Sequence, residues 1–78
     1  MKIIDQLNNL EIFTKKITSN VKGLNRREKQ KAFRFLVDWH TQIFLDLFEE
    51  RGGKIDYNKD PLFLKLSSIT DDFYKLMR

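Results

Sequence analysis

The sequence predicts an all-α protein, a three-helix bundle with a long central helix, short linkers and no sheet. Three observations lead to this prediction. A long segment over residues 25–53 carries many apolar residues and a helix signal at each end. The segments before and after it carry apolar residues at steps of three and four, the spacing of an amphipathic helix. The connections between the three segments are short, as in helices that pack side by side.

The first helix is expected over about residues 2–21. Its apolar residues recur at alternating steps of three and four, and they form one seam along the helix. The seam comprises Ile3, Leu7, Leu10, Phe13 or Thr14, Ile17 and Val21. This helix therefore offers one apolar face to cover the central helix.

The central helix is expected over about residues 26–51, with both of its ends marked. Asn25 and Glu28 have the spacing of a capping box, in which each side chain accepts from the other residue's backbone amide. Gly52 and Gly53 follow the helix, and a glycine there can take the left-handed conformation of a Schellman or αL cap. These two signals fix the ends of the helix.

Between these caps the apolar residues spread over an arc of roughly 220°, against ~100° for an ordinary surface helix. One face is centred on Ala32, Leu36, Ile43 and Leu47, flanked on one side by Phe33, Val37, His40, Phe44 and Phe48 and on the other by Phe35 and Trp39. Such a helix must be covered from two or three directions. We therefore expect it to expose a strip that a partner can cover.

The third helix is expected over about residues 61–77. Asp60 and Pro61 have the form of an N-cap followed by proline at the first helical position, where its missing amide costs nothing. A second seam follows, formed by Leu62, Leu66, Ile69, Phe73 and Leu76 and widened by Phe63, Tyr74 and Met77. In the linker before this helix, Ile55 and Tyr57 alternate with polar residues, which predicts a short extended piece lying on the bundle.

Length and composition limit what the chain can be. Its 78 residues are expected to form a single domain over 1–78, and so small a core leaves about 3–5 kcal/mol of net stability without extra support. The chain has no cysteine and a single histidine, so we expect no disulfide, no metal and no cofactor. Association with a partner, either a second copy or another protein, is the remaining source of support.

The chain is also expected to be cytoplasmic and to make no membrane contact. No apolar run approaches the ~20 residues of a membrane span, and Asp5 and Gln6 interrupt the N-terminus where a signal peptide would be apolar. The abundance of Lys, Ile, Asn and Phe favours an AT-rich bacterial or phage genome as its source.

Enzyme chemistry is not expected, and neither is a small-molecule substrate. His40 lies two positions after Asp38 on a helix, so the two side chains point in different directions. We expect His40 to pack on the apolar face and to form a hydrogen bond with one neighbour. The acidic pairs Glu49–Glu50 and Asp71–Asp72 are adjacent on helices and diverge by about 100°.

Positive charge gathers in one part of the chain. Residues 22–34 carry six cations against Glu28, a net charge of +5, whereas the rest of the chain carries −1. Basic residues in the first turns of a helix oppose its macrodipole at a cost of a few tenths of a kcal/mol each. The cations expected to meet a phosphate backbone or an acidic protein are Lys22, Arg26, Arg27, Lys31 and Arg34. Alternatively, Arg34 pairs with Asp38 and Lys31 with Glu28 on an ordinary solvated face.

A second candidate surface follows the edge of the apolar arc. Phe35, Trp39, Gln42 and Asp46 succeed one another at steps of four, three and four. Trp is enriched among the residues that anchor protein interfaces, so this row is a candidate partner-binding surface. Alternatively, Phe35 and Trp39 simply pack under the first helix or the linker.

These observations favour a small non-enzymatic binding module that acts through protein–protein interaction. It is expected to work as a homodimer or as a subunit or inhibitor of a larger complex. The alternative is a nucleic-acid-binding regulator that uses the basic cluster at residues 22–34. No motif in the chain carries a resemblance to a known family.

Overall fold

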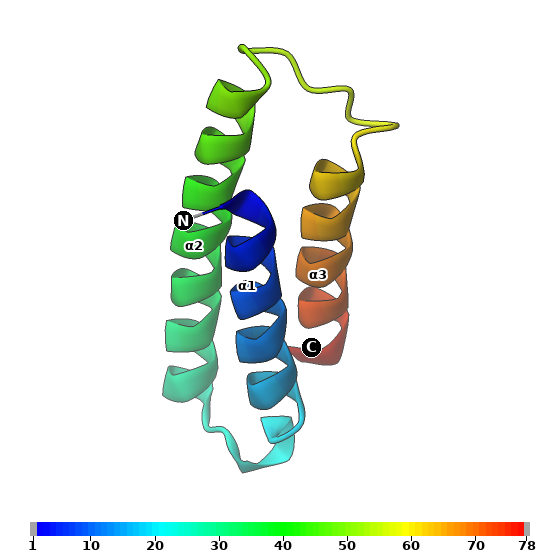
Figure 1. Ribbon diagram of the computed structural model, residues 1–78. Helices are drawn as coiled ribbons and strands as arrows, with labels where there is room; N and C mark the ends of the chain where they lie inside the picture. Colours follow the sequence, from blue (N-terminus) through cyan, green and yellow to red (C-terminus); the bar gives the residue numbers. More distant parts are fainter. Residues whose placement is uncertain (1, 78) are drawn as a thin grey trace.

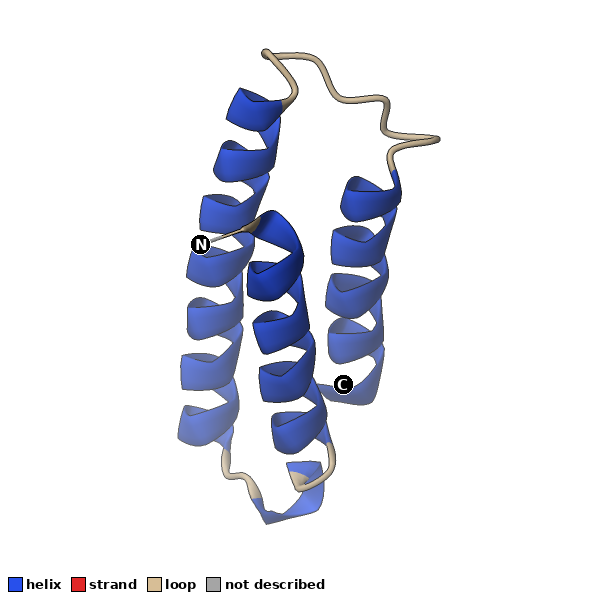
Figure 2. Cartoon of the chain, viewed as in Figure 1, coloured by secondary structure: helices blue, strands red, loops and turns tan. Residues whose placement is uncertain are grey.

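The computed structural model describes residues 2–77 and contains three α-helices (Figure 1). They are α1, Ile3–Thr18; α2, Arg26–Glu50; and α3, Pro61–Met77; a short 3-10 helix, η1, spans Val21–Gly23. Residues 2–77 include no strand (Figure 2). The predicted all-α bundle with its longest helix in the middle is thus confirmed, and α2 has 25 residues.

The three helices lie side by side in an elongated bundle of 41 × 20 × 17 Å. α2 runs antiparallel to α1 and α3, which run parallel to each other (Figure 1). Each helix contacts both of the others. The bundle is therefore the simple consequence of two short reversals of the chain, one on either side of α2.

The core contains residues from all three helices at helical spacing. They are Ile3, Leu7, Leu10 and Thr14 of α1, Ala32, Leu36, Ile43 and Leu47 of α2, and Leu66, Ile69, Phe73 and Met77 of α3. Of the two alternatives for the first seam, Thr14 is buried and Phe13 is turned to the side that faces α2. The Thr14 hydroxyl donates to the Glu11 carbonyl at 2.9 Å, so this buried polar group has a partner.

The first helix ends earlier than predicted, at Thr18 instead of about residue 21. The hydroxyls of Thr18 and Ser19 donate to carbonyls of their own helix, at 2.8 Å to Thr14 and 2.9 Å to Lys16. Such local bonds compete with continued helix formation, and Asn20 and Gly23 favour a turn. Val21 nevertheless packs against the core, from η1 instead of from α1.

Both predicted caps of α2 are confirmed. The Glu28 amide donates to Asn25 Oδ1 at 2.8 Å, and the Asn25 amide donates to Glu28 Oε1 at 3.4 Å, which completes the capping box. At the other end the Gly53 amide donates to the Phe48 carbonyl and the Gly52 amide to the Glu49 carbonyl. This is the Schellman pattern, which requires a positive φ at Gly52 (71°); Gly53 also has a positive φ, of 87°.

The linker between α2 and α3 is closed by an ion pair. Arg51 Nε lies 2.7 Å from Asp60 Oδ2, and Asp60 Oδ1 accepts from the amides of Leu62 and Phe63. One buried carboxylate therefore caps α3 and holds the end of α2. The linker differs from the predicted extended piece: it consists of two turns around a short irregular stretch, from which Ile55 packs against the core.

This ion pair predicts a specific acid sensitivity. The hydrogen bond from Arg51 lowers the pKa of Asp60 below its ordinary value of 3.8. A carboxylate whose pKa is lower in the folded state stabilises the fold above its unfolded pKa, and this stabilisation is lost as the pH falls through the folded pKa. Asp60→Asn should therefore be less stable than the wild type near neutral pH and should lose less stability on acidification.

Urea unfolding at about pH 6 and about pH 2.5 measures both effects. The matched control is Asp71→Asn, which removes an exposed carboxylate from the same helix and should unfold as the wild type does at both pH values. Equal acid sensitivity in Asp60→Asn and the wild type would contradict this account of the linker.

Core packing predicts a second effect on stability. Leu36 has no exposed surface, so Leu36→Ala should lower the free energy of unfolding by about 2–5 kcal/mol. Ile12 is 65% exposed, and Ile12→Ala should change the free energy of unfolding by less than about 0.5 kcal/mol. Urea titrations followed by far-UV circular dichroism measure the difference. Comparable losses in the two variants would show that the core is not centred where the structure places it.

Candidate interaction surfaces

The helices leave a considerable apolar area uncovered, most of all on α2. Phe35, Val37, Leu45 and Phe48 of this helix are all exposed, and Phe35 is 57% and Leu45 52% accessible. α1 and α3 thus cover only part of the wide apolar arc of α2. Val37 and Phe48 lie on one flank of this arc and Phe35 on the other, so the exposed apolar area is divided between two sides of α2.

An aromatic cluster fills the groove between α1 and α2. The ring centroid of Phe13 lies 5.2 Å from that of Phe35 and 5.6 Å from that of Trp39, and those of Phe35 and Trp39 lie 5.8 Å apart. Beside the cluster lies a shallow apolar hollow of about 280 Å³, lined in part by Ile17 and Leu24. Phe35 is therefore held in place by two rings while most of its own surface stays open.

The predicted row of Phe35, Trp39, Gln42 and Asp46 is divided by the structure. Asp46 accepts hydrogen bonds from Gln6 Nε2 of α1 at 3.2 Å and from Gln42 Nε2 at 3.0 Å. Trp39 and Asp46 are half-buried against α1, whereas Phe35 and Gln42 are exposed. For Trp39 this agrees with the alternative prediction that it packs under the first helix. Half of the row is thus used to hold α1, and the other half remains open.

A neighbouring row is open along its whole length, and the sequence analysis named Lys31, Phe35 and Gln42 of it but did not predict the row. Its residues follow one another at alternating steps of four and three and are all exposed; we call them the outer row: Lys31, Phe35, Asp38, Gln42, Leu45 and Glu49. Most of them are polar, so a search for apolar periodicity passes over them. The signal that reveals the row is a seven-residue repeat that lies outside the core face.

The basic cluster is exposed at one end of the bundle. Lys22 lies on η1, and Arg26, Arg27, Lys31 and Arg34 lie on the first turns of α2. Within residues 2–77 the ion pairs are Lys15–Glu11 and Arg51–Asp60, so none of these five cations has a carboxylate partner there. The alternative pairs of Arg34 with Asp38 and of Lys31 with Glu28 are not formed. The positive charge of the cluster is therefore uncompensated.

Aromatic residues also join α2 to α3, and His40 lies among them. Phe33 stacks on Tyr74 at 5.4 Å and meets Phe73 edge-on at 5.3 Å. His40 lines a hollow of about 330 Å³ with Phe63, and burial lowers its pKa below the ordinary 6.5. The sequence analysis predicted a hydrogen bond between His40 and one neighbour, but the imidazole has no hydrogen-bond partner among the residues that the structure describes. A neutral imidazole beside aromatic rings is suited to packing.

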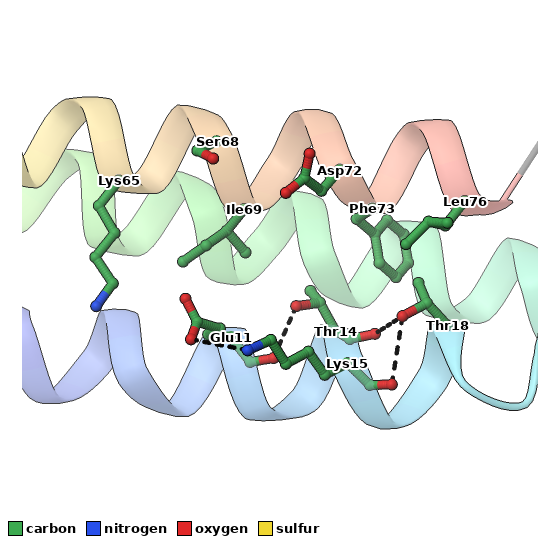
Figure 3. Close-up of a pocket in the computed structure, with 10 residues that line it drawn as sticks. All are labelled: Glu11, Thr14, Lys15, Thr18, Lys65, Ser68, Ile69, Asp72, Phe73 and Leu76. Carbon is green, nitrogen blue, oxygen red and sulfur yellow. Dashed lines mark hydrogen bonds and ion pairs between the residues drawn. The ribbon is translucent and has the colours of Figure 1, made fainter.

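A further groove of about 250 Å³ lies between α1 and α3 (Figure 3). The two hydroxyls that α1 contributes to it are turned back onto α1, since Thr18 donates to the Thr14 carbonyl and Thr14 to that of Glu11. Lys15 Nζ lies 3.3 Å from Glu11 Oε1 in the same groove. Because these polar groups already bond within α1, the arrangement favours a structural role for this groove.

The described part of the chain offers neither a metal cluster nor a membrane span. Over residues 2–77, no three His, Asp or Glu side chains lie close enough together to hold a metal ion. No helix there is both long enough and apolar enough to cross a bilayer. No family model, curated protein or solved structure matches this chain. The function must therefore be inferred from the geometry of the chain itself.

Proposed function

We propose that this protein is a non-enzymatic cytoplasmic binding module that acts through protein–protein contacts made by the outward face of α2, the face that carries the outer row. The observation that carries the proposal is Phe35, a large ring that is 57% exposed although Phe13 and Trp39 support it. Aromatic residues held rigidly at a surface make effective anchors, because little side-chain freedom is lost when a partner covers them. The module works as a homodimer or as a subunit or inhibitor of a larger complex.

The charges near Phe35 indicate what kind of partner surface would fit. Arg27, Lys31 and Arg34 lie on the same helix, within about two turns on the N-terminal side of Phe35, and they lack carboxylate partners within residues 2–77. Uncompensated charge around an apolar anchor speeds encounter with an oppositely charged surface and helps to orient it. A partner with an acidic patch beside an apolar hollow is therefore favoured.

A photo-reactive residue at position 35 tests whether this face binds protein. With p-benzoylphenylalanine in place of Phe35, irradiation of the purified protein or of its native cells should give a discrete protein adduct. The partner must lie within contact distance of the exposed ring. The adduct is measured by gel mobility and mass spectrometry, and Leu45→Asp in the same chain should reduce it.

The matched control places the same photo-reactive residue at Ile12, which is 65% exposed on the outer side of α1. It should give no discrete adduct, since that position lies outside the proposed surface. Equal labelling from the two positions, or no adduct from position 35 in either setting, would contradict the proposed function.

Nucleic-acid binding is the second candidate function, and the uncompensated basic cluster favours it. Lys22, Arg26, Arg27, Lys31 and Arg34 are exposed together at one end of α2. Cations in this arrangement can contact successive phosphates, and such contacts release counterions and weaken steeply with added salt.

A salt titration tests this second candidate. If a short DNA duplex or single-stranded RNA binds, neutralising Arg27, Lys31 and Arg34 to Gln should lower the slope of log K against log salt by about 0.7–0.9 per lost contact. Changing Lys54, Lys59 and Lys75 to Gln removes the same total charge elsewhere and should leave the slope nearly unchanged. Absence of binding to either nucleic acid at low salt would exclude this function.

A further inference from the structure

The residue types of the outer row are arranged symmetrically about its midpoint. Position 40 lies at its centre, with Lys31 and Glu49 nine residues on either side of it. Phe35 and Leu45 lie five residues on either side, and Asp38 and Gln42 two. A cation thus mirrors an anion, an apolar residue mirrors an apolar residue, and a carboxylate mirrors an amide.

This pattern specifies one partner. If a second identical α2 lies antiparallel to the first about a two-fold axis at position 40, each residue of the row faces its mirror position. Lys31 then meets Glu49 of the second copy, Phe35 meets Leu45, and Asp38 meets Gln42. We propose that the protein partner of the outward face of α2 is a second copy of this chain, paired antiparallel in this register, a proposal that rests on the proposed function.

The placement of charge along α2 supports an antiparallel partner independently of the pairing. Glu49 lies in the last turn of α2, at the negative end of the helix macrodipole, where an acidic residue is unfavourable, and Lys31 lies in the second turn, toward the positive end. In an antiparallel pair Lys31 lies beside the negative end of the other helix and Glu49 beside its positive end. A charge that opposes the dipole of its own helix is therefore complementary to the dipole of the helix in the second copy.

The apolar part of the row supports the same geometry. Phe35 and Leu45 are 57% and 52% exposed, and they are the two large apolar residues of the outer row. In the antiparallel pair, Phe35 of each copy packs against Leu45 of the other, which gives two equivalent apolar layers. The alternating steps of four and three keep these layers along one seam between helices. Phe13 already supports Phe35 from α1, so the seam would continue the aromatic cluster of each copy.

Introduced cysteines test the register directly, because the chain contains none of its own. A chain with Lys31→Cys and a chain with Glu49→Cys should form a mixed disulfide under mild oxidation. Each variant alone should not, because two positions 31 in the antiparallel pair lie about 27 Å apart at the helical rise of ~1.5 Å per residue. Crosslinking of position 31 to itself would indicate a parallel pair and would overturn the proposal.

Charge reversal tests the same register in solution by sedimentation. The wild type should sediment at twice its chain mass of 9.4 kDa. Lys31→Glu or Glu49→Lys alone places like charges opposite each other at two sites and should weaken the dimer by about tenfold or more. The double variant, and an equal mixture of the two single variants, should recover the dimer. Ile12→Ala is the control and should leave the mass unchanged.

The outcomes separate this inference from the proposed function. A wild type that remains a monomer at about millimolar concentration overturns the second copy as partner, and a position-35 adduct with a different protein would then still support the proposed function. A dimer that neither charge reversal weakens overturns the register. All variants carry changes at exposed positions, and unchanged helix content by circular dichroism shows that the fold is intact.

Discussion

The structure depends on one geometric constraint: a helix packed against only two others cannot be covered all round. α2 has 25 residues, whereas α1 and α3 have 16 and 17. Leu36, Ile43 and Leu47 are sealed completely, because they face both neighbours. Phe35 and Leu45 lie further round the helix and stay open. The exposed strip therefore follows from the number of neighbouring helices, and the candidate surface lies where the bundle has no further helix to supply.

Polar contacts decide which part of α2 remains available. Gln6 donates to Asp46, and Asp46 in turn accepts from Gln42, so α1 is held to the face beside the outer row. At the end of α2, Arg51 holds Asp60 and so sets where α3 begins. Both contacts attach covering helices to one side of α2. The opposite side has no comparable attachment among the described residues, and this asymmetry leaves one long face for another molecule.

The features that the sequence predicted well are local ones. The capping box of Asn25, the double-glycine cap and the start of α3 each depend on a few neighbouring residues, and each formed as expected. What the sequence left open depends on competition between alternatives. Thr14 and Phe13 both fitted the first seam, and only packing against α2 decided that the ring lies to the side. The outer row was not predicted because most of its residues are polar, and because only packing shows that Trp39 and Asp46 hold α1 while the outer row stays open.

The two candidate uses of α2 share Lys31 and otherwise require different residues. An antiparallel pair would use Lys31 of each copy, while Arg26, Arg27 and Arg34 lie outside the outer row. Since the helices would run in opposite directions, these remaining cations would gather at opposite ends of the pair. Removing Lys31 from solvent also lowers the repulsion within each cluster, because a carboxylate of the other copy would lie beside it. Self-association would thus leave two separate basic ends for an acidic partner, and it would compete with such a partner only for Lys31.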